Sequence, residues 1–138
     1  MKIKCISSKN SSCNEKFYIK EGKEYTTYAL SVFDGTMWYC ICDEVYNFYP
    51  KWYSSIFFKI IDNRLSRFWI SGYREENNRI LPFLSFPEWA KDPYFYGELI
   101  EDNSNDPNAI IFKKYKELMD LEFPDPSISE KAQVGDAT

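Results

Sequence analysis

Four cysteines are the first residues with the chemistry for a reactive or metal-binding site. Cys5 and Cys13 are separated by seven residues, whereas Cys40 and Cys42 are separated by one. A zinc site is usually built from pairs of ligands roughly two to four residues apart, and no histidine is present to complete a mixed site. We therefore expect the thiols to be buried small hydrophobes, with a metal site or a reactive thiol as the alternatives.

The absence of histidine also bears on catalysis, because imidazole has the ordinary pKa best suited to proton transfer near neutral pH. The sequence has no Gly-x-Ser-x-Gly elbow, no Gly-rich phosphate loop and no His-Glu-x-x-His helix. A carboxylate, lysine or thiolate with a shifted pKa would be needed instead. We expect a protein that is not an enzyme and uses no cofactor.

The stretch "EDNSNDPN", residues 101–108, begins like a calcium loop, with Asp102, Ser104 and Asp106 spaced by two. Pro107 stands where such a loop requires Gly, and Lys113 stands where the bidentate Glu belongs. The pattern therefore predicts a loop that ends in a helix cap, with Asp106 accepting hydrogen bonds from free amides.

Aromatic side chains gather in "CDEVYNFYPKWY", residues 42–53. Alternation along a strand would place Tyr46, Phe48, Pro50 and Trp52 on one face, and Asn47, Tyr49, Lys51 and Tyr53 on the other. A small barrel has one interior, so one set must lie outside it. Those rings are either covered by the C-terminal half or form a docking surface. The candidate binding residues are Tyr46, Tyr49, Trp52 and Tyr53.

Charge is unevenly distributed along the chain, which carries a net charge of −4. Residues 1–80 hold 12 Lys or Arg against 9 Asp or Glu, and residues 81–138 hold 5 against 12. The C-terminal part is therefore acidic. Its candidate binding residues are Glu98, Glu101, Asp102 and Asp106, which would attract a basic partner.

The elements that must position these residues begin with short strands. Alternation and β-branched or aromatic content predict strands at residues 2–6, 24–32, 37–43, 48–53 and 56–61. Asp34-Gly35 indicates a hairpin, and Pro50 suits a short or edge strand. Five short strands within the first 62 residues predict a small barrel.

Several of these segments carry a resemblance. "GKEYTTYAL" at 22–30, "YCICDE" at 39–44, "YP" at 49–50 and "FFKIID" at 57–62 together resemble small bacterial and phage proteins that begin with an SH3-like β-barrel. The resemblance covers residues 1–62. It implies a five-stranded SH3-like barrel and carries little information on function, because such barrels serve many tasks.

The C-terminal half is less regular. Residues 64–73 suit one more strand, residues 73–79 a polar loop, and residues 79–86 an extended segment interrupted by Pro82. Pro87, Pro93 and Pro107 each follow a residue in the position of a helix cap. The clearest helix follows Asp106, with Ile111, Tyr115 and Leu118 on its apolar face and Lys113, Lys114 and Glu117 toward water.

These expectations define an α+β fold: a barrel at residues 1–62, a strand and short helices packed on it at 63–123, and a flexible tail at 124–138. No apolar run is long enough to cross a bilayer, and the N-terminus lacks the apolar core of a signal peptide. We therefore expect a cytoplasmic protein that has no membrane partner.

The small, acidic and aromatic-rich chain is similar in profile to bacterial immunity proteins, which neutralise a toxin by covering its active site. The sequence-based hypothesis is therefore a non-enzymatic immunity-type inhibitor that binds a protein, such as a basic toxin. One alternative is a phage or mobile-element accessory protein that binds a small ligand or a peptide. The other is a single-stranded nucleic-acid binder, a partner class that the modest positive charge of residues 1–80 disfavours.

Overall fold

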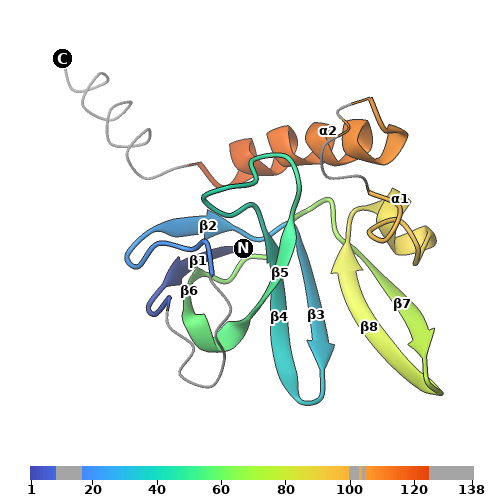
Figure 1. Ribbon diagram of the computed structural model, residues 1–138, viewed down its shortest axis with the longest axis horizontal. Coiled ribbons are helices and arrows are strands. Elements are labelled where there is room, and N and C mark those ends of the chain that lie inside the picture. Colours follow the sequence, from blue (N-terminus) through green and yellow to red (C-terminus); the bar gives the residue numbers. More distant parts are fainter. Residues whose placement is uncertain (9–16, 100–102, 104, 125–138) are drawn as a thin grey trace.

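The computed structural model describes residues 1–8, 17–99, 103 and 105–124. Its strands form two antiparallel sheets (Figure 1), and the helices follow the second sheet in the chain, which confirms the α+β class. The first sheet has the order β2 (Glu24–Thr26), β1 (Lys2–Cys5) and β6 (Phe58–Asp62). The second has the order β5 (Lys51–Ser54), β4 (Thr36–Ile41), β3 (Ala29–Phe33), β8 (Arg79–Ser85) and β7 (Ile70–Glu76). The 3-10 helix η1 (Ser55–Phe57) joins β5 to β6, and α1 (Pro87–Lys91) and α2 (Pro107–Glu122) follow β8.

The run predicted as one strand at residues 24–32 is two strands, β2 and β3, which belong to different sheets. Thr27 and Tyr28 lie between them. The Thr27 amide donates to the Met1 carbonyl at 3.1 Å, and the Tyr28 amide donates to the Cys40 carbonyl at 2.8 Å. The described part of residues 1–62 therefore has six strands where five were predicted. The predicted strand is divided because the amide of Thr27 bonds toward the first sheet and that of Tyr28 toward the second.

Two hairpins have two-residue turns with left-handed backbone. Asp34 and Gly35 have φ of 48° and 74°, which confirms the predicted turn between β3 and β4. Asn77 and Asn78 have φ of 51° and 63° and join β7 to β8. The prediction of a polar loop at residues 73–79 was therefore wrong, because Asn tolerates the left-handed region and allows both strands to continue to the turn.

The five-stranded sheet buries side chains on both faces. Tyr39 and Tyr53 project from one face toward the three-stranded sheet, with ring centroids 5.9 and 6.4 Å from that of Phe58. The other face carries Ala29 and Cys40, both fully buried. Helix α1 packs against β7 and β8, and α2 runs across the ends of the strands (Figure 1).

Helix α2 buries Phe112, Tyr115 and Met119. The predicted apolar face is right at Tyr115, whereas Ile111 and Leu118 lie at the half-buried flanks of the stripe. The ring of Phe112 meets that of Tyr28 edge-on at 5.5 Å, which anchors the helix beside the β2–β3 junction.

The segment before β7 is held by side-chain hydrogen bonds rather than by strand pairing. Ser66 donates to Glu122 Oε1 at 2.6 Å, and Trp69 Nε1 donates to the Tyr28 carbonyl at 2.9 Å. The predicted strand at residues 64–73 therefore begins only at Ile70. Among the described residues, no helix is both long and apolar enough to cross a membrane.

Candidate functional site

Pro82 divides the five-stranded sheet into two arms. The ladder between β3 and β8 has two residue pairs, Leu30 with Leu84 and Ser31 with Phe83. The next pair would join Val32 to Pro82, but proline has no N–H to donate. The Ser31 hydroxyl instead donates to the Pro82 carbonyl oxygen at 3.0 Å. Beyond this point the β3–β4 and β7–β8 hairpins diverge (Figure 1).

The tips of these hairpins are joined by an ion pair. Arg79 Nη1 lies 2.6 Å from Asp34 Oδ1, and both side chains are more than half exposed. An exposed pair of this kind contributes little to stability. The opening between the arms is therefore closed by backbone pairing at the β3–β8 ladder, and at its other end only by the weak Arg79–Asp34 ion pair.

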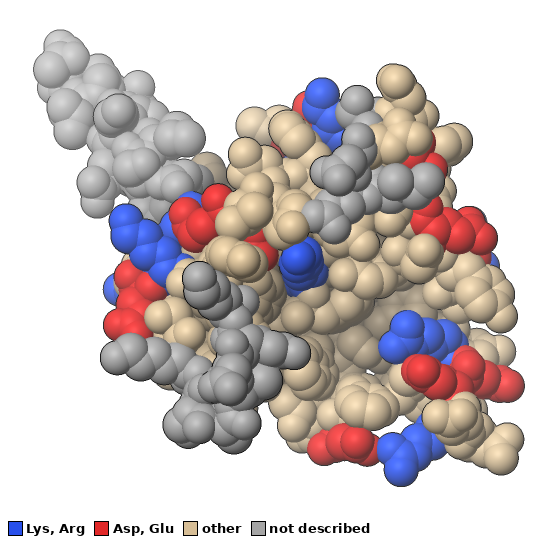
Figure 2. All heavy atoms as spheres, viewed as in Figure 1, with Lys and Arg blue, Asp and Glu red and all other residues tan. Residues whose placement is uncertain are grey.

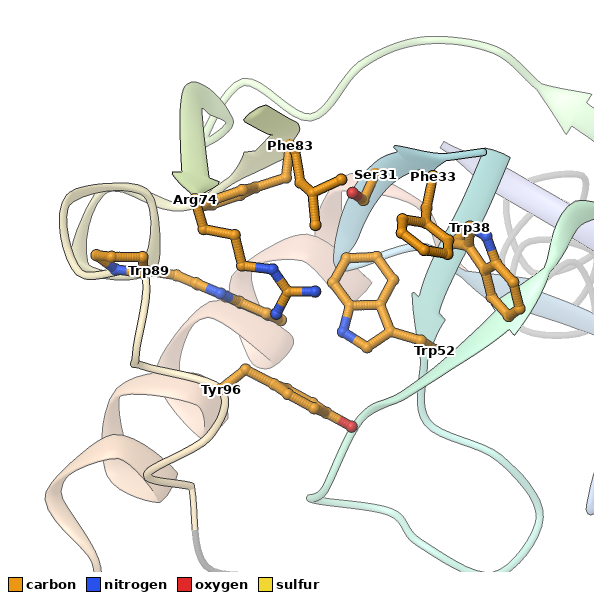
Figure 3. A pocket seen from close by; sticks show the side chains of 10 residues that line it. Ser31, Phe33, Trp38, Trp52, Arg74, Phe83, Trp89 and Tyr96 are labelled. Atoms are coloured by element: carbon orange, nitrogen blue, oxygen red, sulfur yellow. The ribbon is translucent and has the colours of Figure 1, made fainter. Parts of the chain in front are cut away.

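A cavity of about 230 Å³ lies at this opening, and we call it the aromatic cleft. Figure 3 shows its side chains, which come from both arms, from α1 and from the segment after α1. Six of them are aromatic: Phe33, Trp38, Trp52, Phe83, Trp89 and Tyr96. Because several of these rings remain partly open to solvent, the cleft offers a largely apolar wall to a ligand.

Three of the rings support one another. Trp89 and Tyr96 stack with centroids 5.6 Å apart and planes 7° apart. Trp52 meets Trp89 edge-on, with centroids 5.8 Å apart, and lies 6.3 Å from Tyr96. These contacts fix the orientation of Trp52, which makes the wall rigid before any ligand arrives.

Gly72 allows α1 to bring Trp89 to the cleft. A Cβ atom at Gly72 would lie 2.8 Å from the Ala90 carbonyl oxygen and 2.8 Å from Phe83 Cζ. Any side chain on this residue would therefore push α1 away from β7. Trp89 itself is only 3% exposed, which places it at the base of the cleft.

Among the described residues, Arg74 is the only charged side chain that lines the aromatic cleft. Its guanidinium extends from β7 toward Trp52 and Tyr96 (Figure 3). Its ion pair with Glu76 is long, at 3.5 Å, and its side chain is about half exposed. The guanidinium can therefore exchange this contact for an anionic group of a ligand.

The two candidate residues on β5 point to opposite faces. Tyr53 is buried, and its hydroxyl donates to Asp43 Oδ2 at 2.7 Å. Asp43 also accepts from the amides of Val45 and Tyr46, so this tyrosine belongs to the structural support of residues 43–46. Trp52 faces the aromatic cleft.

The other two tyrosines lie outside regular structure, because β5 begins only at Lys51. Strand alternation therefore does not extend back to Tyr46 and Tyr49. Their rings contact each other at 6.2 Å, and Tyr49 lies 6.1 Å from Tyr96. Tyr49 and Trp52 thus both contact Tyr96 of the C-terminal segment, and Tyr46 is connected to it through Tyr49. Trp52 is half-buried, so the C-terminal half covers this ring in part through Trp89 and Tyr96.

The acidic candidates are described in part. Glu98 is exposed at the end of the turn that carries Tyr96. Asp106 accepts from the Ala109 amide at 3.2 Å and caps α2, which confirms the predicted cap. Glu101 and Asp102 lie outside the described residues, as do Ser104 and all of the predicted tail after Pro124.

The thiols are placed as expected for small hydrophobes. Cys5 and Cys40 are buried and Cys42 is half-buried, while Cys13 lies outside the described residues. Burial raises the pKa of Cys40 strongly and that of Cys42 to about 12. These thiols are therefore protonated near neutral pH. Within the described ranges, no three His, Cys, Asp or Glu side chains gather as a metal site would require.

The binding residues predicted from the sequence did not include Arg74, Trp89 or Tyr96, although Arg74 belongs to the arginines of the nucleic-acid alternative. Two signals could have indicated them: the proline within residues 79–86, which marks a break in strand pairing, and Asn77-Asn78, which marks a hairpin. No protein-family model, curated protein or solved structure matches the chain.

Proposed function

We propose that this chain is a non-enzymatic binding protein that recognises a protein partner through the aromatic cleft. The observation that carries the proposal is the partly open wall of Trp52, Tyr96 and Phe33 beside one guanidinium. Tryptophan, tyrosine and arginine dominate the binding energy of protein interfaces, because they supply large contact areas with a polar end. A cavity of about 230 Å³ suits one inserted side chain better than a drug-sized molecule.

The acidic charge of the C-terminal part favours one role for such a binding protein, that of an immunity-type inhibitor in the cytoplasm. Glu98 is exposed and lies two residues after Tyr96 in the chain, so the proposal assigns it to the rim of the aromatic cleft. An acidic rim would speed the approach of a basic toxin, and the apolar wall would hold the complex.

The SH3-like barrel is part of the same proposal. Three features support it: the β3–β4–β5 meander, the 3-10 helix η1 that follows β5, and the pairing of β6 with β1. The β7–β8 hairpin would then extend one sheet of this unit, with the aromatic cleft at the junction.

Single-stranded nucleic acid fits this surface less well. A basic groove needs arginines that are free to contact phosphates. The arginines of residues 64–79 already contact acidic or aromatic side chains: Arg64 with Asp62 at 2.6 Å, Arg79 with Asp34 at 2.6 Å, Arg74 with Glu76 at 3.5 Å, and Arg67 with the Phe68 ring at 4.9 Å. The charges of Arg64 and Arg79 are thus compensated by close ion pairs, and the exchangeable guanidinium of Arg74 is too little positive charge for a groove that follows a phosphate backbone.

The product of the neighbouring gene is the probe for this function, because toxins and their antidotes are usually encoded side by side. We expect it to form a stoichiometric complex with the wild-type chain and, if toxic, to be neutralised in a growth assay. Phe33→Ser should weaken the complex at least about tenfold, since this ring lines the cleft and is 42% exposed. Calorimetry would give the affinities.

Phe48→Ser is the matched control, because Phe48 is 56% exposed and does not line the aromatic cleft. Equal loss in both variants, or no loss in either, would show that the cleft is not the binding site. Glu98→Lys should slow association at low salt and leave dissociation nearly unchanged. If Glu98→Lys leaves the association rate unchanged, the charge argument for a basic toxin is wrong.

A further inference from the structure

Strand β7 has a free edge. It lies at the end of the five-stranded sheet and pairs only with β8 among the described strands. All of its seven residues except Gly72 are exposed. Within the described part of the chain, no backbone hydrogen bond outside the regular elements involves residues 70–76. Such an edge is able to accept another strand.

The register identifies which backbone groups point outward. In a hairpin with a two-residue turn, the residues that flank the turn exchange both hydrogen bonds, and every second pair does the same. Glu76 and Arg79 flank this turn, so the Tyr73–Pro82 pair is a non-hydrogen-bonded one. Pro82 fits that position because it lacks an N–H. The amide and carbonyl of Tyr73 therefore face away from β8, and those of Ser71 and Glu75 do likewise.

A groove runs beside this edge. A hollow of about 730 Å³ lies between residues 71–76 and residues of the 90–97 segment. Six consecutive residues of β7 line it, so it follows the edge of the strand rather than one face. It meets the aromatic cleft at Arg74, Pro93 and Tyr96. Figure 2 shows a largely tan hollow here, with charged side chains on its lower-right rim.

Charged side chains project from both faces of β7 beside this groove. Arg74 projects on the side of the aromatic cleft, on the face that it shares with its ion-pair partner Glu76, whereas Glu75 projects on the opposite face. Residues directly opposite each other on neighbouring strands stabilise a sheet when their charges differ. A complementary strand therefore has an acidic residue facing Arg74, a basic residue next to it facing Glu75, and an aromatic residue two positions from the acid on the face of the aromatic cleft.

We propose that an extended segment of a protein partner adds to the free edge of β7, with its aromatic side chain in the cleft and its carboxylate on Arg74. The proposal rests on the proposed function, since it names the chemistry of the partner at the same site. Backbone hydrogen bonds to Tyr73 supply affinity, and the cleft and Arg74 supply specificity.

The probe is a random heptapeptide phage library selected on the full chain, followed by fluorescence anisotropy with the enriched peptides. We expect enriched sequences to carry an aromatic and an acidic residue two positions apart, with a basic residue next to the acid. Tyr73→Pro removes an outward amide, and Tyr73→Val removes the same ring but keeps that amide. The enriched peptides should bind Tyr73→Pro at least about tenfold more weakly than Tyr73→Val. Circular dichroism and thermal melts establish that both variants are folded.

Side-chain recognition has its own comparison. Arg74→Gln should weaken the acidic peptide about tenfold and change little for the same peptide with its acid replaced by the amide. Equal binding by Tyr73→Pro and Tyr73→Val would overturn strand addition. If Phe33→Ser still weakened those peptides, the proposed function would stand without it. If the peptides bound Tyr73→Pro and Phe33→Ser as well as the wild type, both strand addition and the proposed function would be contradicted. A selection that enriches no peptide would overturn strand addition alone.

Discussion

The Ser31 hydroxyl donates a hydrogen bond across 3.0 Å to the Pro82 carbonyl oxygen, at the point where the ladder between β3 and β8 ends. The carbonyl of Pro82 thus has a partner on β3, whereas the missing amide leaves Val32 without one on β8. Val32 and Phe33 are each 42% exposed as a result. One residue without an N–H therefore opens the sheet and gives the aromatic cleft its location.

Pro82→Val should close part of this opening. The new amide at position 82 can donate toward β3, so we expect one more ladder pair and a gain in unfolding free energy of about 1 kcal/mol. The cleft should narrow, and partner binding should weaken. Hydrogen exchange followed by NMR would measure protection of that amide. Rapid exchange at position 82, together with unchanged binding, would show that the proline does not cause the split.

Gly72→Ala tests how closely α1 must approach β7. The added methyl group would meet Ala90 backbone atoms and the Phe83 ring at 2.8 to 3.0 Å, so we expect a loss of about 1–3 kcal/mol in the free energy of unfolding. Gly97→Ala is the control, because its Cβ would meet nothing closer than the Tyr94 carbonyl oxygen at 3.7 Å. Urea denaturation would compare them. Equal stability of the two variants would contradict the packing argument.

Local signals predicted much of the fold. The helix cap at Asp106, the Asp34-Gly35 turn and the burial of Cys40 all follow from a few neighbouring residues, and the structure confirms each. Such features depend on backbone geometry and composition within one element. They need no knowledge of which elements meet.

The site could not be predicted in the same way, because it depends on long-range pairing. Trp52 and Trp89 come from segments 37 residues apart, and only the positions of β5 and α1 bring their rings to 5.8 Å. The division of residues 24–32 between two sheets was missed for the same reason. The alternation of residue types predicted a strand there, but it carried no information on the pairing partners. These partners differ, since β2 pairs with β1 whereas β3 pairs with β4 and β8.

Tyr53→Phe should destabilise the loop that carries Tyr46. Removing the hydroxyl leaves Asp43 Oδ2 without the donor that lies at 2.7 Å, in a residue only 3% exposed. We expect a loss of about 1–3 kcal/mol in the free energy of unfolding. Tyr73→Phe is the control, since Tyr73 is 59% exposed. Denaturant titration would measure both, and an unchanged midpoint for Tyr53→Phe would show that this hydrogen bond contributes little.

The half-buried thiol of Cys42 predicts a loss of stability at alkaline pH. Burial raises its pKa from an ordinary 9 to about 12, so the folded state keeps a proton that the unfolded state releases between these values. Stability from this group is therefore fully present below about pH 9 and declines as the pH rises toward 12. Cys42→Ala should make the pH dependence of the unfolding free energy shallower between pH 9 and 11.

Thiol labelling provides the second readout. In a Cys13→Ser background, Cys5, Cys40 and Cys42 should react slowly with iodoacetamide at pH 8 in the folded protein and rapidly in urea. Mass spectrometry would assign the modified residue. Fast labelling of Cys42 in the folded protein, or an unchanged pH slope in Cys42→Ala, would contradict the raised pKa. Either result would restore the alternative that Cys42 is a reactive thiol.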